Sequence, residues 1–253
     1  MTPMHPTEDL IPILKKLRLS GVLQTLDMRL RQAVDDDVPH SEFLLRLLTD
    51  EVERRDAKQL DTRLRKASFE HRKSLEDFDF TFNPNVPKTK IIDLATCGFV
   101  GKRENVCIVG QTGVGKSHIA QAIGHRACLA GHNVIYVPAH QMLKDLRASR
   151  ADGTHERRLA RYSSVDLLII DDLGLRPLAG EEPLDLYEII RQRYERASTM
   201  ITSNRALEEW APLFNDDLLA NAAMDRLLHH AHIIEVTGAS YRNPPRRSKS
   251  AAS

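Results

Sequence analysis

One segment of eight residues, 110–117, constrains the fold of this chain more than any other part of its sequence. It reads GQTGVGKS and matches the pattern GxxxxGK[ST] at every defined position. An apolar, β-branched run at residues 106–109 precedes it, and a segment with helical character at residues 117–129 follows it. A strand, a glycine-rich turn and a helix in this order form a phosphate-binding loop. The segment therefore predicts an α/β fold that holds a nucleotide phosphate at the end of a strand.

The residues of this loop have distinct physical roles. Glycines lack a Cβ atom, so backbone N–H groups can surround a phosphate, and the following helix directs its positive N-terminus at the anion. Lys116 reaches the β- and γ-phosphates, and the hydroxyl of Ser117 is a ligand for Mg²⁺. We therefore expect ATP and Mg²⁺ as cofactors. The residues expected to contact the nucleotide are Gly110, Gln111, Thr112, Gly113, Val114, Gly115, Lys116, Ser117 and His118.

Two acidic residues follow the most apolar run of the chain. Residues 167–170 read Leu-Leu-Ile-Ile, and Asp171 and Asp172 come directly after them. Two buried carboxylates without partners would be unfavourable, and a metal ion accounts for the first one. We expect Asp171 to bind Mg²⁺ together with Ser117, and Asp172 to accept the proton of an attacking water. An acidic turn without a chemical role is the alternative.

Apolar runs alternate with helical patterns beyond residue 90, which predicts a parallel sheet with helices on both faces. The strand at residues 199–202 is expected to lie between the strands that carry the phosphate loop and the acidic pair. Asn204, just after it, would then hold the attacking water or the γ-phosphate, and a polar turn is the alternative. The five expected strands are residues 106–109, 134–137, 165–170, 199–202 and 233–236.

Arg226 lies in a helical run at residues 216–229. An arginine presented across a subunit boundary would stabilise negative charge on the γ-phosphate bound by a neighbouring subunit. The alternative is an ion pair within the chain, for instance with Asp225. Arg205 is a second candidate for the same role.

The first 73 residues have helical patterns and a local excess of positive charge. Apolar residues between positions 10 and 17 follow a helical spacing, and Ser41 is expected to cap a third helix. Residues 54–73 contain eight basic and three acidic residues, which fits either a solvated helix surface or a contact with DNA phosphates. A second basic stretch includes Lys144 and Arg147. The expected nucleic-acid contacts are Arg54, Arg55, Lys58, Arg63, Arg65, Lys66, Lys144 and Arg147.

These patterns divide the chain into four parts. Residues 1–73 are expected to form a helical domain that binds DNA or a partner, and residues 74–90 a linker. Residues 91–242 form the nucleotide-binding domain, and residues 243–253 a basic, disordered tail. The net charge of +1 does not argue for or against nucleic acid, so any basic surface must be local. The chain has no apolar run of membrane-spanning length, and its three cysteines without CxxC spacing indicate a reducing cytoplasm rather than a zinc site.

The motifs together resemble the AAA+ ATPases, and flanking motifs narrow the resemblance to the IstB family. IstB proteins are ATP-dependent helpers of insertion-sequence transposases, and the DnaC-type helicase loaders are close relatives. The resemblance covers residues 8–242. Besides the phosphate loop it rests on Phe69, LEDFDF at 75–80, YER at 194–196, TSN at 202–204, DRLLHH at 225–230 and GASYR at 238–242.

The resemblance implies an AAA+ core with a five-stranded parallel sheet, preceded by a small all-α N-terminal domain. It implies ATP-driven self-assembly on duplex DNA and recruitment and stimulation of a transposase. Asp171 matches the metal-binding acid, Asp172 the catalytic acid, Asn204 the sensor and Arg226 the arginine finger. Many AAA+ proteins have Glu in place of Asp172, so the shorter side chain predicts a slow ATPase, which we expect DNA to stimulate.

Two other functions fit parts of the sequence. A DnaC-like helicase loader would bind a replicative helicase through residues 1–70 and would prefer single-stranded DNA. A metabolic phosphotransferase would use the same loop to move a phosphoryl group to a small molecule. It would have no need of Arg226 from a neighbouring subunit.

Overall fold

The structure is a computed structural model and describes residues 6–242. The basic tail expected at residues 243–253 lies outside this range. The chain forms two compact units, which divide between Thr62 and Arg63. The N-terminal domain expected from the sequence ends at residue 73, within the second unit.

The first unit contains three helices, α1 (Pro6–Lys16), α2 (Ser20–Asp35) and most of α3 (His40–Ala67). Its small core consists of Val22, Leu26 and Leu47. The expectation that Ser41 caps α3 is wrong, because the helix begins at His40 and its first bond runs from the Phe43 N–H to the carbonyl of Pro39. Proline at position 39 has no N–H to satisfy, so it suits the entry to a helix.

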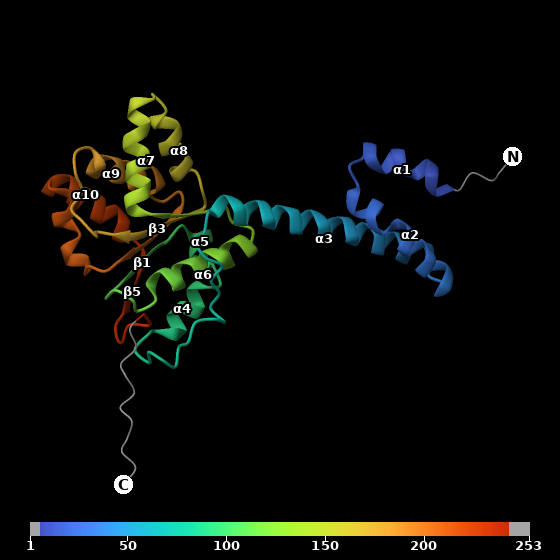
Figure 1. Ribbon diagram of the computed structural model, residues 1–253, viewed down its shortest axis with the longest axis horizontal. Coiled ribbons are helices and arrows are strands. Elements are labelled where there is room, and N and C mark those ends of the chain that lie inside the picture. Colours follow the sequence, from blue (N-terminus) through green and yellow to red (C-terminus); the bar gives the residue numbers. More distant parts are fainter. Residues whose placement is uncertain (1–5, 243–253) are drawn as a thin grey trace, which may run out of the picture. The chain divides into compact units, whose positions relative to one another are not determined.

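The second unit is built on a five-stranded sheet in which every pair of neighbouring strands is parallel (Figure 1). The strand order is β2-β3-β4-β1-β5, so β4 lies between the strands that carry the two motifs, as expected. This confirms the predicted α/β fold with its parallel sheet. The strands are β1 (Asn105–Gly110), β2 (Val134–Pro138), β3 (Leu167–Leu173), β4 (Ser198–Ser203) and β5 (Ala231–Val236).

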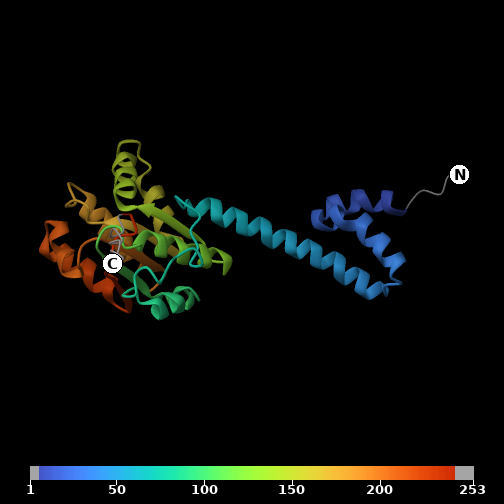
Figure 2. The same ribbon diagram turned by 60° about the horizontal axis from the view of Figure 1, so that its bottom comes forward.

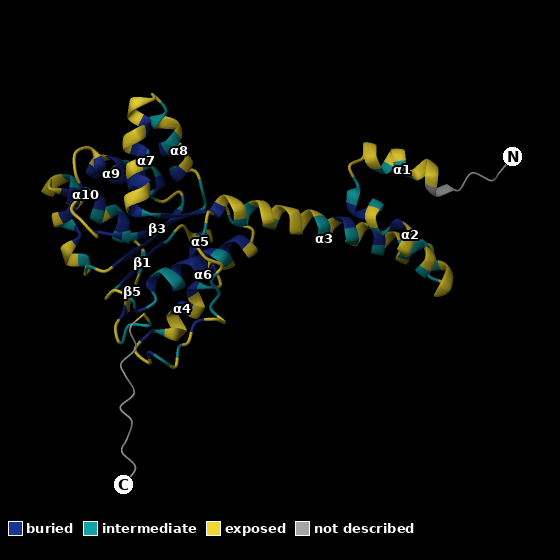
Figure 3. Ribbon diagram, viewed as in Figure 1, coloured by how far each residue is buried: buried dark blue, intermediate teal, exposed yellow. Residues whose placement is uncertain are grey.

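Helices cover both faces of the sheet, which explains why the strands read as continuous apolar runs. Leu168 and Ile170 belong to a core formed with α7 (Ala139–Ala151), α8 (His155–Ser163), α9 (Glu182–Arg193) and α10 (Asp217–Leu228). α7 and α8 lie side by side in both views (Figures 1 and 2). Ile169, which alternates with these residues, comes close to Gly124 of α6 (Lys116–Leu129). Burying each such Leu or Ile contributes roughly 1.5–3 kcal/mol, and Figure 3 shows the sheet as the most buried part of this unit.

Short elements complete the second unit. The segment that the sequence assigns to a linker, residues 74–90, contains turns and the beginning of α4 (Lys88–Leu94). Its Phe78 is buried, and Asn83 Nδ2 donates a hydrogen bond of 2.7 Å to the carbonyl of Thr237. α5 (Gly98–Lys102) leads into β1, and the short helices η1 (Leu207–Glu209) and η2 (Ala211–Phe214) bury Trp210 against the core. Within residues 6–242, none of the helices combines the length and the apolar character that crossing a membrane requires.

Candidate nucleotide-binding site

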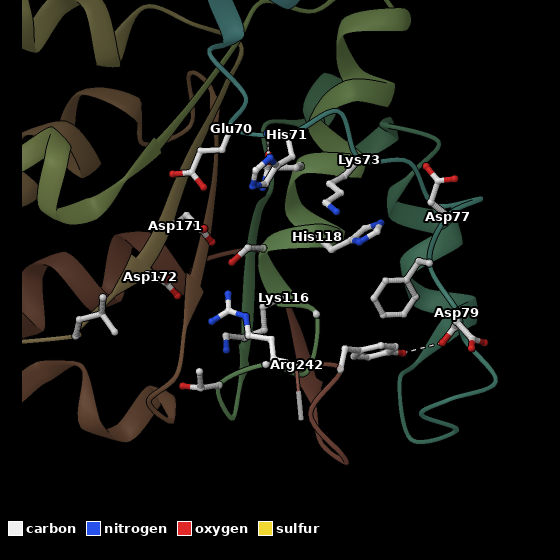
Figure 4. A pocket seen from close by; sticks show the side chains of 18 residues that line it. Glu70, His71, Lys73, Asp77, Asp79, Lys116, His118, Asp171, Asp172 and Arg242 are labelled. Carbon is white, nitrogen blue, oxygen red and sulfur yellow. Dashed lines mark hydrogen bonds between the residues drawn. The ribbon is translucent and has the colours of Figure 1, made fainter. Parts of the chain in front are cut away.

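A cavity of about 670 Å³ lies where the phosphate loop meets the acidic pair (Figure 4). Lys116, Asp171, Asp172 and Arg242 gather on one side of it, and His118 lies opposite. Four parts of the chain form its walls, namely the loop with the start of α6, the end of β3, the segment before α4 and the segment after β5. The residues that line the cavity include Phe78, Gly113, Gly115, Lys116, Ser117, His118, Asp171, Asp172, Tyr241 and Arg242.

The glycines of the loop are required by its backbone and by its neighbours. Gly113 and Gly115 have φ values of +86° and +98°, a region that residues with a Cβ atom rarely adopt. A Cβ atom at Gly113 would lie 2.1 Å from Ser240 Oγ, and one at Gly115 would lie 2.6 Å from the ring of Phe78. The outer side of the loop is therefore packed against the rest of the unit, which fixes the direction of its N–H groups.

Lys116 points into the cavity and is only 5% exposed. Its Nζ donates a hydrogen bond of 2.9 Å to the carbonyl of Gln111, at the other end of the loop. Burial lowers the pKa of Lys116, and the charges of Asp172 and Asp171 oppose this shift. An ammonium group in such a place is poorly compensated by water, so it provides a strong attraction for a phosphate.

A β-bulge explains how two consecutive acidic residues can both face the cavity. In a regular strand, neighbouring side chains point to opposite faces. The register of β3 on β4 shifts here: Ile170 pairs with Ile201, whereas Leu173 pairs with Ser203, so β3 has one extra residue. Bulges redirect side chains in this way and are common beside active sites. The extra residue allows the carboxylates of Asp171 and Asp172 to line the same cavity.

The two carboxylates have different surroundings. Asp171 is 4% exposed; its Oδ2 accepts a hydrogen bond of 2.5 Å from the Tyr136 hydroxyl, and its Oδ1 accepts one from the Thr202 hydroxyl. Asp172 has a φ of +55°, and its N–H donates to Thr202 Oγ1 at 2.9 Å. Burial and the charge of Asp171 raise the pKa of Asp172, although Lys116 and Arg242 oppose the shift. A raised pKa makes Asp172 a better proton acceptor than a solvated aspartate.

An aromatic wall closes the side of the cavity opposite the acidic pair. His118 Nε2 donates to the carbonyl of Ser74 at 2.7 Å, and its ring lies 5.2 Å from that of Phe78. The ring of Phe78 lies 5.3 Å from that of Tyr241, whose hydroxyl donates to the carbonyl of Asp79 (dashed in Figure 4). Segments from before and after the sheet therefore meet at the phosphate loop. Flat aromatic faces of this kind suit a nucleotide base.

The donors present fit a magnesium ion bound with a nucleotide. The Ser117 hydroxyl and the Asp171 carboxylate line the same cavity as Lys116, and both supply the oxygen ligands that Mg²⁺ prefers. Within residues 6–242, no group of three or more His, Cys, Asp or Glu residues could hold a metal ion by itself. The three cysteines are buried and unpaired.

Most of the expected nucleotide contacts meet at the cavity. Thr112, Gly113, Gly115, Lys116, Ser117 and His118 line it. Gly110, Gln111 and Val114 do not, since Val114 is buried in the core and Gly110 packs against the carbonyl of Val236.

Asn204 is exposed and is not among the residues that line the cavity. The side chain from β4 that contacts the acidic pair is Thr202 instead. The next residue of the strand, Ser203, donates to the carbonyl of Leu173 at 2.7 Å.

The two candidate arginines differ in their contacts. Arg205 Nε donates to the carbonyl of Gly174, just after β3. Arg226 donates to the carbonyl of Ala222 at 2.8 Å, and its guanidinium carbon lies 5.6 Å from the centre of the Tyr187 ring. Within the described part of the chain Arg226 makes no ion pair with Asp225, and it does not line the cavity.

None of the expected nucleic-acid contacts is among the residues that line the cavity. Lys144 and Arg147 are exposed on α7. The other six belong to α3, where Arg55 pairs with Glu51 and Arg63 donates to the carbonyl of Cys128 at 3.4 Å.

Sequence reasoning did not assign several residues that shape the site, namely Phe78, Tyr136, Thr202, Tyr241 and Arg242. A signal for Tyr136 existed, because a tyrosine within a buried strand needs a partner for its hydroxyl. The contribution of Arg242 depends on the path of the chain after β5, and the local sequence does not determine this path.

Comparisons with known proteins show the family of this chain. The family model for IstB-like ATP binding proteins matches residues 12–251. An IS21 insertion-sequence ATP-binding protein of Pseudomonas aeruginosa is 36% identical over 244 residues, which cover 96% of this chain and 91% of that protein. An insertion-sequence ATP-binding protein of Mycobacterium tuberculosis is 40% identical over 230 residues, covering 90% and 92%.

Solved structures show the same fold. DnaI matches 66% of this chain and 92% of its own, with 28% identity and a TM-score of 0.56. DnaA of Aquifex aeolicus with bound AMPPCP matches 67% of this chain and 51% of its own, with 22% identity and a TM-score of 0.55. The second unit therefore has the AAA+ fold that the resemblance implied. With a family match over nearly its whole length, the chain belongs to the IstB-like ATP-binding proteins of insertion sequences.

Proposed function

We propose that this protein binds Mg-ATP, assembles in that state on duplex DNA, and recruits and stimulates the transposase of its insertion sequence. The observation that carries the proposal is the meeting of Lys116, Ser117, Asp171 and Asp172 at one cavity. The relatives are ATP-binding proteins of insertion sequences by name, which supports the biological setting.

Each wall of the cavity suits one part of the nucleotide. Backbone N–H groups of the loop and the Lys116 ammonium bind the phosphates, and the Phe78, His118 and Tyr241 rings hold the base. Ser117 and Asp171 hold Mg²⁺, which offsets negative charge on the phosphates when it is bound. Arg242 adds a further positive charge on the side of Lys116 (Figure 4).

Hydrolysis depends on Asp172 as the proton acceptor for water. Its raised pKa favours this role, and its short side chain limits its reach, which supports slow turnover. Slow turnover suits a switch whose ATP-bound assembly has to persist. Asn204 directly follows β4 and does not line the cavity. Its role as a sensor therefore requires a movement that brings its side chain to the nucleotide.

Self-assembly is supported by the surroundings of Arg226. Its guanidinium has no acidic partner among the described residues and lies outside the cavity of its own chain. It is therefore available to a nucleotide bound by a neighbouring subunit, where it would stabilise the γ-phosphate charge. DNA contact is assigned to the exposed residues Lys144 and Arg147 on α7 and to the basic residues of α3.

Calorimetry and sedimentation test the proposal together. Mg-ATP should bind the wild-type protein, and Lys116→Ala should abolish binding while the protein stays folded. The assembly should be larger with ATP than with ADP, and duplex DNA should increase the difference. If the protein stayed the same monomer with ATP and with ADP, each with and without duplex DNA, the assembly step would be refuted.

A DnaC-like helicase loader is the second candidate, because DnaI shares the fold at 28% identity. It predicts preference for single-stranded DNA and capture of a replicative helicase. Binding assays with both forms of DNA, and pull-downs with purified transposase and helicase, distinguish the two functions.

A further inference from the structure

The carboxylate of Asp171 is held from both sides by hydroxyl groups of the neighbouring strands. Tyr136 of β2 donates to Oδ2 at 2.5 Å, and Thr202 of β4 donates to Oδ1. β3 lies between these two strands in the sheet, and Pro138 of β2 pairs with Asp171. The position of this carboxylate is therefore set by three adjacent strands.

We propose that Tyr136 is a positioning residue that fixes Asp171 in the orientation required to bind the magnesium of Mg-ATP. The inference rests on the proposed function, since it assumes that Asp171 is the metal ligand. Neither the sequence motifs nor the comparisons assign a role to Tyr136.

The hydroxyl groups of Tyr136 and Thr202 form a clamp on the Asp171 carboxylate, and the geometry explains why this clamp is needed. Asp171 lies in the β-bulge, where the regular ladder between β3 and β4 is interrupted. Backbone bonds alone hold a bulged residue less firmly than a regular strand residue. Two charge-assisted hydrogen bonds, one to each oxygen, restrict rotation of the carboxyl group.

The clamp also leaves room for a metal ion. Each carboxylate oxygen has about two lone-pair sites, so one donor per oxygen leaves further sites open to the cavity. Tyr136 and Thr202 are themselves 2% and 0% exposed, and neither lines the cavity. They contact the ligand from behind, as partners of metal ligands commonly do.

The chain offers a matched control in Tyr162. This tyrosine is also buried, and its hydroxyl donates a hydrogen bond of 3.0 Å to an acid, Asp145 Oδ2. Tyr136 and Tyr162 both line a groove along the outer edge of β2, yet only the former contacts Asp171. Tyr162→Phe therefore removes a comparable bond without touching the metal ligand.

Binding of a fluorescent ATP analogue, measured with Mg²⁺ and then with EDTA, tests the role without relying on turnover. Tyr136→Phe should reduce the gain in affinity that Mg²⁺ provides by about 10–100-fold, which is the loss that removing a partner of a metal ligand typically causes. The affinity measured in EDTA should stay unchanged. Tyr162→Phe should leave both values unchanged. Thr202→Val should resemble Tyr136→Phe, and Thr202→Ser should retain the wild-type gain because it keeps the hydroxyl.

Electron paramagnetic resonance with Mn²⁺ in place of Mg²⁺ adds a spectroscopic measure. The Mn²⁺ signal of the complex with protein and nucleotide should broaden in Tyr136→Phe. An unchanged Mg²⁺-dependent gain in Tyr136→Phe would overturn the inference. Equal losses in Mg²⁺ and EDTA, with an unchanged unfolding midpoint, would also overturn it, because Tyr136 would then support the cavity in general. If the wild-type protein bound no nucleotide in either buffer, the proposed function itself would fail.

Discussion

The backbone N–H of Tyr241 donates a hydrogen bond of 2.9 Å to the carbonyl of Gly113. The segment after β5 is thereby bonded directly to the phosphate loop, and the ring of Tyr241 lies against Phe82 and Phe78. A short C-terminal segment and the residues before α4 thus close the cavity together.

Replacing the Tyr241 ring should weaken nucleotide binding. Tyr241→Ala removes an aromatic face that the base can stack on, and stacking of a base on an aromatic side chain contributes about 1–3 kcal/mol. We expect a matching loss of ATP affinity in calorimetry. Tyr241→Phe keeps the ring and loses only the bond to the Asp79 carbonyl, so most of the affinity should remain. Equal affinities for Tyr241→Ala and wild type would place the base elsewhere.

Asp172→Asn should stabilise the protein at neutral pH while it abolishes hydrolysis. The folded state raises the pKa of Asp172, so ionisation of this group opposes folding. Asparagine removes the charge and tolerates the positive φ of this position. Each kcal/mol relieved corresponds to roughly 2–4 °C in the unfolding midpoint of a chain of this size.

The stabilisation by Asp172→Asn should depend on pH. Stability due to a raised carboxyl pKa is fully present below the pKa of the unfolded state and is lost as pH rises through the folded-state pKa. The advantage of Asp172→Asn should therefore be largest near pH 7–8 and vanish below about pH 4. Asp225→Asn, a change at an exposed acid, serves as the control. A stabilisation that grew towards low pH would contradict the assigned cause.

Much of the core could be predicted from the sequence because its signals are local. The loop pattern, the apolar run before Asp171 and the alternation of strands and helices each depend on a few neighbouring residues. They correctly predicted the five parallel strands.

The walls of the cavity could not be predicted in the same way. Phe78 and Tyr241 meet at the loop only because of tertiary packing, and no local pattern indicates that two distant segments will converge. The bulge that turns both Asp171 and Asp172 towards the cavity is equally invisible in an apolar run. Thr202 contacts Asp171 because Ile170 pairs with Ile201, so that the next residues of the two strands are neighbours, and the local sequence does not indicate this pairing.

Glu51→Gln should destabilise the first unit. The carboxylate of Glu51 accepts hydrogen bonds from the N–H groups of Gly21 and Val22, so a residue of α3 caps the N-terminus of α2. Loss of an N-terminal cap typically costs about 0.5–2 kcal/mol. Hydrogen exchange of the α2 amides should therefore accelerate. Glu53→Gln, at an exposed position of the same helix, should leave the exchange unchanged.

The effect of Glu51 should also depend on pH. Burial alone would raise its pKa, but hydrogen bonds from Arg55, Gly21 and Val22 lower it on balance. The stabilisation is then present above the unfolded-state pKa, about 4.3, and is lost as pH falls through the folded-state value. Wild type and Glu51→Gln should therefore converge in stability as pH falls from about 4.3 through the folded-state pKa. A difference that did not shrink as pH fell would show that packing, rather than charge, is responsible.

Mixing two inactive variants should restore hydrolysis if Arg226 acts on a nucleotide bound by a neighbouring subunit. Lys116→Ala lacks the phosphate contact and Arg226→Ala lacks the arginine, so each protein alone should be inactive. In an equal mixture, roughly a quarter of the interfaces of a head-to-tail assembly would join an intact Lys116 to an intact Arg226. ATPase activity should reappear in that proportion and depend on protein concentration.

Arg205→Ala provides the comparison, because Arg205 is already bonded to the Gly174 carbonyl within its own chain. If the mixture gave only the sum of the two residual activities, or if Arg205→Ala complemented Lys116→Ala instead, Arg226 would not be the residue supplied in trans.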